Sequence, residues 1–394
     1  MRSIRLLPAA GGVAAALALA LTATACGPTE TPAADKPAGT TATASPSEGG
    51  SGAGSSSGLP KDLADRLKKH GVDLDKWKGG EWKNWDRETW LREADDFVNP
   101  VIEDLWDGER MQTAKSPDQT IETQATSGGS DPTPRPVTAQ REKTPYHRYA
   151  APVGKIFFDA PEGHMACSGT IVKDPRRPGK SNLVWTAGHC VHAGKKGGWY
   201  RNIMFAPAFN DKGKSPASLR NAQGYEIYPY GQYWADWAVT SGEWIQSGGT
   251  NQAWPYDYAV LHVQPQQGRK SLEETVGAAL PVDFSAPQPA QAGTIGAWGY
   301  PGAPPYNGVI MHKCLDRATR LATAPATPVM YRIGCTMTAG SSGGGWFRVL
   351  PNGTTALVSN TSIGPAGSNG WLAGPQLGRG AKAAHDMVSK KFAR

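Results

Sequence analysis

The sequence lacks a hydrophobic run long enough to cross a membrane. Its one extended apolar stretch, from about Gly11 to Leu21, is shorter than the about 20 residues that a spanning helix needs. The chain also lacks a stripe of Lys and Arg interleaved with aromatic residues. Its formal net charge of +7 therefore does not indicate a nucleic-acid-binding protein.

The N-terminus has the pattern of an exported protein. Arg2 and Arg5 precede the apolar run and small residues follow it, which predicts a secretory signal peptide over residues 1–25. Its removal leaves a net charge of 7 − 2 = +5. Cys26 stands where bacterial lipoproteins carry their lipidated cysteine, although Ala23 replaces the more usual Leu. We expect a lipoprotein on the outer face of the cell membrane, and the alternative is a secreted protein.

Cysteine is scarce, with five residues in 394. Export places them in an oxidising compartment, where an even set forms disulfides. If Cys26 carries a lipid, Cys167, Cys190, Cys314 and Cys335 remain, and the sequence alone leaves their three possible pairings open.

Composition divides the rest of the chain into four parts. Residues 26–59 are rich in Thr, Ala, Ser, Gly and Pro and predict a disordered tether. Residues 60–112 contain five tryptophans and predict a partly helical propeptide or stalk that packs on the larger domain; the alternative is a ligand-binding surface. Residues 113–136 have the composition of a linker, and residues 137–394 form the main domain.

The main domain is predicted to be all-β. Short runs of β-branched and aromatic residues, separated by Gly, Pro and Asn, are typical of a sandwich or barrel. These runs are residues 153–158, 168–172, 182–187, 258–263, 293–300 and 356–360. A long helical pattern occurs only at 378–392, and the insertion at 221–244 is expected to form extra hairpins.

Ser342 is the candidate nucleophile. It is central in GSSGG at 340–344, which fits the G-x-S-x-G elbow of α/β-hydrolases. That fold needs an acid and then a histidine after the serine. Only His385 follows, and neither Asp nor Glu lies between it and Ser342. The order of residues excludes an α/β-hydrolase.

The order His, Asp, Ser is present instead. His189 ends NLVWTAGH, and Asp257 opens the alternating run YAVLHV. These are the parts of a triad in which imidazole takes the serine proton and a carboxylate orients the ring. Asp236 also precedes a strand-like run and is the alternative acid. His192 lacks a third ligand at metal-binding spacing, so we expect no metal site.

Five motifs in order carry a family resemblance. CSGTIV, TAGHC, DYAVL, GYP and CTMTAGSSGGGW together resemble the chymotrypsin/trypsin-like serine peptidases, bacterial branch, which includes the glutamyl endopeptidases. The match spans roughly residues 150–375. It implies two antiparallel six-stranded β-barrels with a C-terminal helix. It also implies a monomeric serine endopeptidase that hydrolyses protein or peptide substrates through an acyl-enzyme, without cofactor or metal.

The resemblance also implies a role for particular residues. His189 matches the general base, Asp257 the orienting acid and Ser342 the nucleophile, while the amides of Gly340 and Ser342 match the oxyanion donors. The residues matched to the primary specificity pocket are Thr336, Met337, Ser362 and Gly364. The implied disulfides are Cys167–Cys190 and Cys314–Cys335.

Departures from the family pattern limit these expectations. Ser341 stands where animal trypsins have an Asp that pairs with a newly cut N-terminus, so activation by that ion pair is not expected, although a propeptide can still block the cleft. No Asp occurs in the pocket-base stretch, which disfavours cleavage after Arg or Lys and leaves apolar, small or Glu preferences open. The alternative function is a catalytically silent binding protein on the same fold.

Overall fold

The computed structural model describes residues 42–43, 99, 101, 105–117, 119–122, 129–367 and 370–393. All of them belong to one compact unit, Gly39–Arg394. The expected signal peptide and Cys26 lie outside the described residues, as do most of the tether and four of the five tryptophans of residues 60–112. No helix in the described part of the chain is both long and apolar enough to traverse a bilayer.

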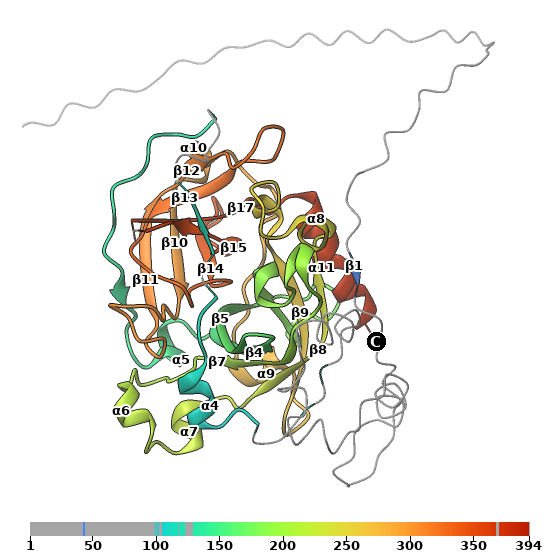
Figure 1. The fold of residues 1–394 in the computed structure, drawn as a ribbon. Coiled ribbons are helices and arrows are strands. Elements are labelled where there is room, and N and C mark those ends of the chain that lie inside the picture. The colour runs from blue at the N-terminus through green and yellow to red at the C-terminus, as the bar shows by residue number, and fades with distance from the viewer. Residues whose placement is uncertain are drawn as a thin grey trace, which may run out of the picture. The chain divides into compact units, whose positions relative to one another are not determined.

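Six antiparallel strands close into a first barrel (Figure 1). They pair in the circular order β4–β5–β6–β9–β8–β7–β4. Their bounds are β4 Val153–Ala160, β5 Gly163–Val172, β6 Leu183–Thr186, β7 Arg201–Pro207, β8 Tyr233–Thr240 and β9 Ala259–Pro265. The short strand β1 (Ala42–Thr43) pairs with β8 outside the closed ring. Fully buried side chains such as Ile156, Val184 and Leu261 belong to the core of this barrel.

The second barrel contains a five-stranded and a three-stranded sheet. The first has the order β15–β14–β10–β11–β3, and the second has the order β12–β13–β17. Their bounds are β3 Gln140–Arg141, β10 Thr294–Gly299, β11 His312–Arg317, β12 Thr319–Leu321, β13 Met330–Gly334, β14 Gly345–Val349, β15 Thr355–Asn360 and β17 Trp371–Pro375. Only Ala318 separates β11 from β12, so one segment runs through both sheets. Tyr331, Ile333 and Trp346 form the centre of its core.

The all-β prediction is confirmed, and each of the six predicted runs forms all or part of a strand. The expected hairpins at 221–244 are wrong. That stretch contains helix α7 (Gly224–Ile227), strand β8 and the start of helix α8 (Gly242–Ser247). Glu226 completes a capping box at α7, and the Ser241 hydroxyl caps α8 by accepting from the Trp244 amide. β8 itself is needed to close the barrel between β7 and β9.

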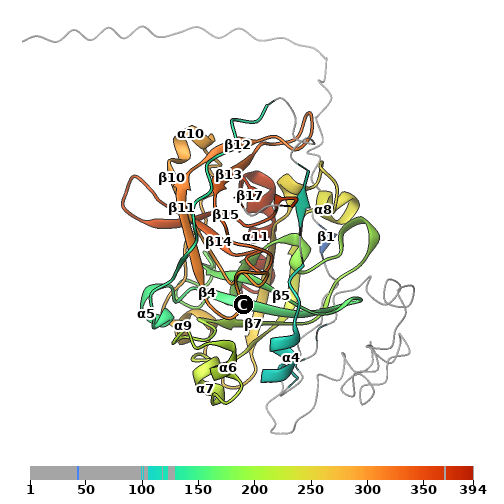
Figure 2. The ribbon, with the colours of Figure 1, turned by 60° about the vertical axis from the view of Figure 1, so that its left-hand side comes forward.

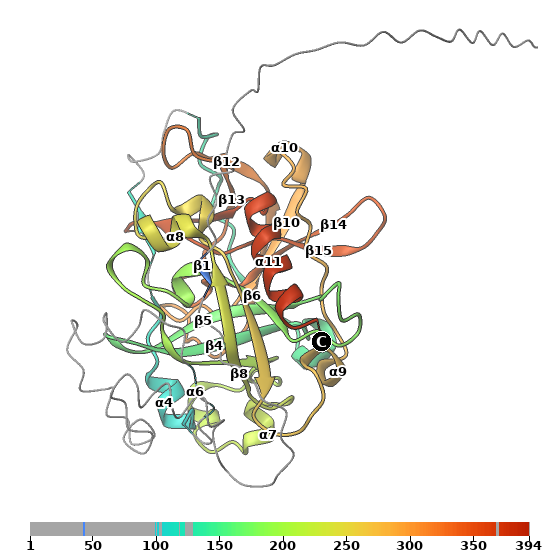
Figure 3. The ribbon, with the colours of Figure 1, turned by 90° about the vertical axis from the view of Figure 1, so that its right-hand side faces the viewer.

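The remaining helices are short, except at the C-terminus. They are α4 Gly108–Thr113, α5 Tyr146–Tyr149, α6 Pro216–Leu219, α9 Leu272–Val276, α10 Pro289–Ala292 and α11 Arg379–Lys391, with single turns at Gly188–Cys190, Gly194–Lys196 and Trp254–Tyr256. Figure 3 shows α11 lying along the first barrel. Ala381, Ala384 and Val388, at helical spacing, are buried on that face.

The described parts of the expected linker, 113–136, contact both barrels. Lys115 pairs with Met165 of β5, and strand β2 (Thr120–Ile121) pairs in parallel with β16 (Gly364–Pro365). Further along, a guanidinium nitrogen of Arg332 donates to the Asp131 carbonyl at 2.5 Å. Figure 2 shows the teal chain rising from α4 between the two sets of strands.

Candidate active site

His189 is held at the end of β6 by backbone and side-chain bonds. It lies in the single turn Gly188–Cys190, and the disulfide Cys167–Cys190 ties this turn to β5. The imidazole is buried, and its Nδ1 lies 2.7 Å from Asp257 Oδ2. The backbone amide of His189 donates to Asp257 Oδ1 at 2.8 Å. The carboxylate therefore fixes both the ring and the backbone of the histidine.

Asp257 lies between the turn Trp254–Tyr256 and β9, and it is completely buried. Ser362 Oγ donates to its Oδ2 at 2.6 Å, in addition to the two bonds from His189. A buried carboxylate is costly unless hydrogen bonds replace its water shell, and these donors supply them. The alternative acid, Asp236, pairs instead with His262, at 2.6 Å.

Ser362 has a contact that the sequence did not reveal. We expected it only as a pocket residue, whereas its hydroxyl also donates to Asp257. The two residues are 105 positions apart and share no local motif. Only the packing of the second barrel against the first brings them together.

The loop of Ser342 lies against the segment that leads to His189. The Ser168 amide donates to the Ser342 carbonyl at 2.7 Å, and the Gly343 amide donates to Thr361 at 2.8 Å. A Cβ on Gly343 would collide with Thr186 and Ala187. Ser342, His189 and Asp257 are therefore brought to one place at the junction of the barrels.

The second ring nitrogen of His189, Nε2, is not used in a hydrogen bond with any described residue. Among the described residues, His189 Nε2 is buried and has no hydrogen-bond partner, so it makes no bond to Ser342 Oγ. Such bonds often tighten only when substrate is present. With Nδ1 directed at a carboxylate, Nε2 is the nitrogen left to accept a proton.

Gly340 shapes the backbone before the serine. Its φ of +97° is in the region that favours glycine, and a Cβ there would lie 2.6 Å from both Ser116 Oγ and the Tyr300 carbonyl. Ser168 Oγ fixes the loop by donating to the Gly340 carbonyl at 2.8 Å. Within the described chain, the amides of Gly340 and Ser342 have no acceptor, so both are available to donate a hydrogen bond to a bound group.

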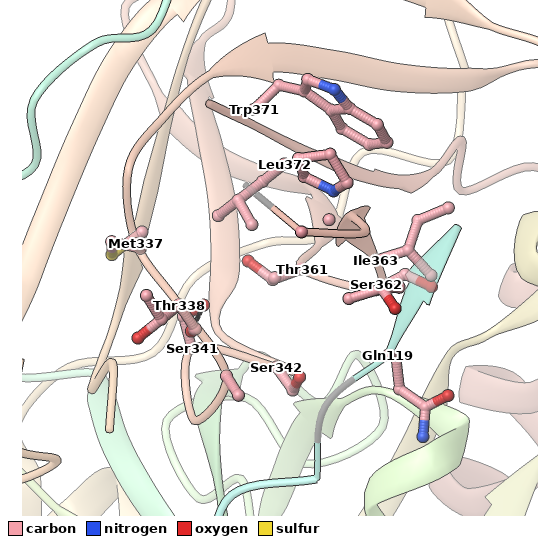
Figure 4. A pocket seen from close by; sticks show the side chains of 15 residues that line it. Gln119, Met337, Thr338, Ser341, Ser342, Thr361, Ser362, Ile363, Trp371 and Leu372 are labelled. Carbon is pink, nitrogen blue, oxygen red and sulfur yellow. Dashed lines mark hydrogen bonds between the residues drawn. The ribbon is translucent and has the colours of Figure 1, made fainter. Parts of the chain in front are cut away.

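A cavity of about 270 Å³ opens beside Ser342. Three residues that the resemblance assigns to the specificity pocket, Met337, Ser362 and Gly364, line it together with Trp371 and Leu372 (Figure 4). Thr336, the fourth expected pocket residue, is not part of the lining. Its hydroxyl instead accepts from the Ala139 amide at 2.9 Å and bonds the Tyr306 hydroxyl at 2.8 Å.

One cluster has the composition of a metal site. In the described part of the chain, the only close group of His, Cys or acidic ligand atoms is Cys167, His189 and Cys190. The two sulfurs are bonded to each other, so they offer no thiolate, which is the form that binds metals. The second disulfide, Cys314–Cys335, also has the implied pairing.

Comparisons with known proteins identify the fold. No family model and no curated protein matches the chain, but solved structures do. A thermostable serine protease, AL20, from an extremophilic microorganism is 32% identical, with a TM-score of 0.50 over 61% of this chain and 98% of that one. The protease Anisep from Arthrobacter nicotinovorans is 28% identical, with a TM-score of 0.50 over 64% and 99%.

A Glu endopeptidase in complex with MPD also matches, at 16% identity and a TM-score of 0.46 over 64% of this chain and 96% of that one. The fold and the identity to AL20 define the class. The chain belongs to the chymotrypsin/trypsin-like serine proteases.

Proposed function

We propose that the chain is a serine endopeptidase whose catalytic residues are His189, Asp257 and Ser342. The observation that carries this proposal is a buried imidazole with Nδ1 bonded to a buried carboxylate and Nε2 left without a partner among the described residues, beside the Ser342 loop. His262 has the same pattern, with Nδ1 bonded to Asp236 and a buried Nε2 without a described partner, so the position beside the Ser342 loop and the complete burial of Asp257 distinguish His189.

The mechanism follows from these positions. His189 Nε2 takes the proton of Ser342 Oγ as the oxygen attacks the peptide carbonyl, and the Asp257 carboxylate stabilises the imidazolium. The amides of Gly340 and Ser342 donate to the carbonyl oxygen as it becomes negative. The imidazolium then gives its proton to the leaving amine, which leaves an acyl group on Ser342. Water, deprotonated by the same ring, hydrolyses this ester and restores the serine.

The lining of the cavity favours a neutral side chain before the cleaved bond. Among the residues that the structure describes, no Asp, Glu, Lys, Arg or His contributes to the lining, so a charged substrate side chain would lose its water without gaining a partner there. Three hydroxyls there are already committed as donors: Thr338 to the Ala303 carbonyl, Ser341 to the Thr338 carbonyl and Ser362 to Asp257. We infer a preference for small or apolar residues over Glu, Arg and Lys.

An irreversible fluorophosphonate probe tests the catalytic assignment. Over long incubation we expect one adduct, located on Ser342 by mass spectrometry, in the wild type and none in Ser342→Ala. Ser341→Ala is the matched control, because Ser341 is the buried neighbour whose hydroxyl only donates to Thr338. A wild type that stays unlabelled would favour the catalytically silent binding protein.

We also propose export and lipidation at Cys26. The signal-like N-terminus and the two disulfides support this, because disulfides persist in oxidising compartments. Metabolic labelling with a fatty-acid analogue should mark the wild type and not Cys26→Ser. An unlabelled wild type recovered from the medium would support ordinary secretion.

A further inference from the structure

Residues 115–117 lie along the first barrel, and residues 119–121, just after them in sequence, lie along the second. At the first barrel, the Lys115 amide donates to the His164 carbonyl at 2.8 Å, and the Ala166 amide donates to the Lys115 carbonyl at 2.7 Å. At the second, the amides of Gly364 and Ala366 donate to the carbonyls of Gln119 and Ile121 at 3.1 and 3.0 Å. The segment is therefore paired with an edge of each barrel.

Between these two pairings the segment lies over the proposed catalytic centre. Ser116 Oγ is 2.6 Å from where a Cβ on Gly340 would stand, which places it against the backbone just before Ser342. Gln119 and Thr120 belong to the same cavity lining as Ser342. Figure 4 shows Gln119 and the teal strand β2 beside Ser362 and Ile363.

An apolar anchor fixes the far end of the segment. Ile121 is only 3% exposed and belongs to a cluster with Trp244, Trp254, Ile363 and Trp371. Burial of a side chain of this size contributes about 1.5–3 kcal/mol relative to exposure. The hydrogen bonds of β2 and this contact hold the segment by both backbone and side chain.

A second anchor holds the near end. Arg110, in α4, pairs with the completely buried Asp159 at 2.6 Å. Trp106 is 1% exposed and packs its ring 5.5 Å from Phe157, while its Nε1 donates to the Asn202 carbonyl at 2.8 Å. The residues just before Lys115 are therefore anchored on the first barrel by buried contacts.

We propose that the described residues 115–117 and 119–121 act as an inhibitory strand that occupies the substrate cleft and keeps the protease inactive until it leaves. The proposal rests on the catalytic role assigned above. The strand is bound without being presented for attack, because no described carbonyl accepts from the amides of Gly340 and Ser342. The Ser342 loop is already hydrogen-bonded while the strand is bound. The strand therefore inhibits by excluding substrate from the cleft and not by disordering this loop.

Two variants of the full chain release the strand by different means. Ile121→Asp places a charge in the apolar cluster, which disfavours the bound state strongly. Lys115→Pro removes the backbone amide that donates to the His164 carbonyl. The Lys115 side chain is exposed, so the substitution removes no buried packing. The matched controls are Ile121→Val, which keeps the anchor, and Val349→Asp, which adds the same charge at a residue that is 67% exposed.

The readout is the rate of Ser342 labelling by the fluorophosphonate probe, with peptide hydrolysis measured in parallel. We expect Ile121→Asp to accelerate both by roughly tenfold or more, since burying an unpaired carboxylate costs several kcal/mol, and Lys115→Pro to accelerate them in the same direction. Both controls should match the wild type. Unchanged rates in folded Ile121→Asp and Lys115→Pro would overturn the proposal.

Hydrogen exchange separates this proposal from the catalytic one. In a Ser342→Ala background, which needs no activity, the amides of Gly364, Ala366 and Ala166 should exchange slowly and should lose protection in Ile121→Asp. If protection is lost and neither the wild type nor Ile121→Asp is labelled or hydrolyses peptide, the strand binds but the catalytic role of Ser342 is refuted. If protection is lost and both proteins are labelled at the same rate, the inhibitory role is refuted and the catalytic role stands. If these three amides exchange equally fast with and without Ile121→Asp, the strand is not bound in the cleft and the proposal fails.

Discussion

Asp257→Asn tests the proposed mechanism directly, because it changes one atom and almost no volume. Asp257 Oδ1 accepts from the His189 amide at 2.8 Å, and Oδ2 accepts from His189 Nδ1 and Ser362 Oγ at 2.7 and 2.6 Å. Asparagine has one oxygen, so its NH₂ must face at least one of these donors. If it faces Nδ1, the ring proton moves to Nε2, where it blocks uptake of the Ser342 proton.

The magnitude follows from the two bonds to Oδ2. Each hydrogen bond to a charged group contributes about 1.5–3 kcal/mol, so the loss of both raises the barrier by roughly 3–6 kcal/mol. At about 1.4 kcal/mol for each factor of ten, kcat/KM falls by roughly 10² to 10⁴. The loss should fall mainly on kcat, because Asp257 is buried behind the imidazole and does not line the cavity.

The assay is hydrolysis of a peptide with a small or apolar residue before the cleaved bond, with thermal unfolding as the check on folding. Asp236→Asn is the matched control, since Asp236 also pairs with a histidine, His262, but outside the proposed site. The control should retain wild-type kcat/KM. An Asp257→Asn protein that is folded and within about threefold of wild type would refute the assignment of Asp257 as the orienting acid.

Three further predictions use the same structure. Ser362→Ala removes one charge-assisted bond to Asp257 and should lower kcat by roughly tenfold to a hundredfold in the same peptide assay; an unchanged kcat would show that the bond is idle. Burial lowers the pKa of His192 to about 4 from 6.5. Because the unfolded chain takes up this proton first, stability should fall as pH drops from 6.5 to 4, by up to about 3 kcal/mol. His192→Gln should flatten that dependence in melting experiments from pH 7 to 4.5. Replacing both cysteines of Cys314–Cys335 with Ala should cost about 3 kcal/mol, measured by denaturant unfolding; a wild-type midpoint would contradict this.

The strands could be predicted from the sequence because each one is marked by the residues within it. Runs such as 153–158 and 258–263 alternate or concentrate β-branched and aromatic residues, and each forms a barrel strand. The insertion at 221–244 does not form hairpins of its own, because it contains one strand, β8, whose partners β7 and β9 both lie outside that stretch. The local composition of 221–244 does not show where the partners of its strand lie.

The candidate site was predictable to the extent that motifs carried it. His189, Asp257 and Ser342 each stand in a recognisable stretch, and the fold brings them together. The bond from Ser362 to Asp257 and the position of Lys115–Ile121 had no such signal. Both depend on contacts between elements that are distant along the chain, and a polar, linker-like composition says nothing of whether a segment binds a cleft.

The segment from Asn360 to Ala366 connects the proposed inhibition to the proposed catalysis. Thr361 exchanges backbone hydrogen bonds with the Ser342 loop, through Gly343 and Gly344, and Ser362 orients Asp257. Two residues further along, Gly364 begins the edge that binds the inhibitory strand. When this strand leaves, the amides of Gly364 and Ala366 lose their acceptors beside an intact site.

Those amides then become donors for any extended peptide that enters the cavity. Unpaired edge groups bind an added strand readily, and the pocket next to them holds one neutral side chain. Substrate and inhibitory strand therefore compete for one set of hydrogen bonds. In the proposed inhibited state, the protease is therefore folded, with the proposed catalytic groups in place, and cannot cleave a peptide until the strand leaves.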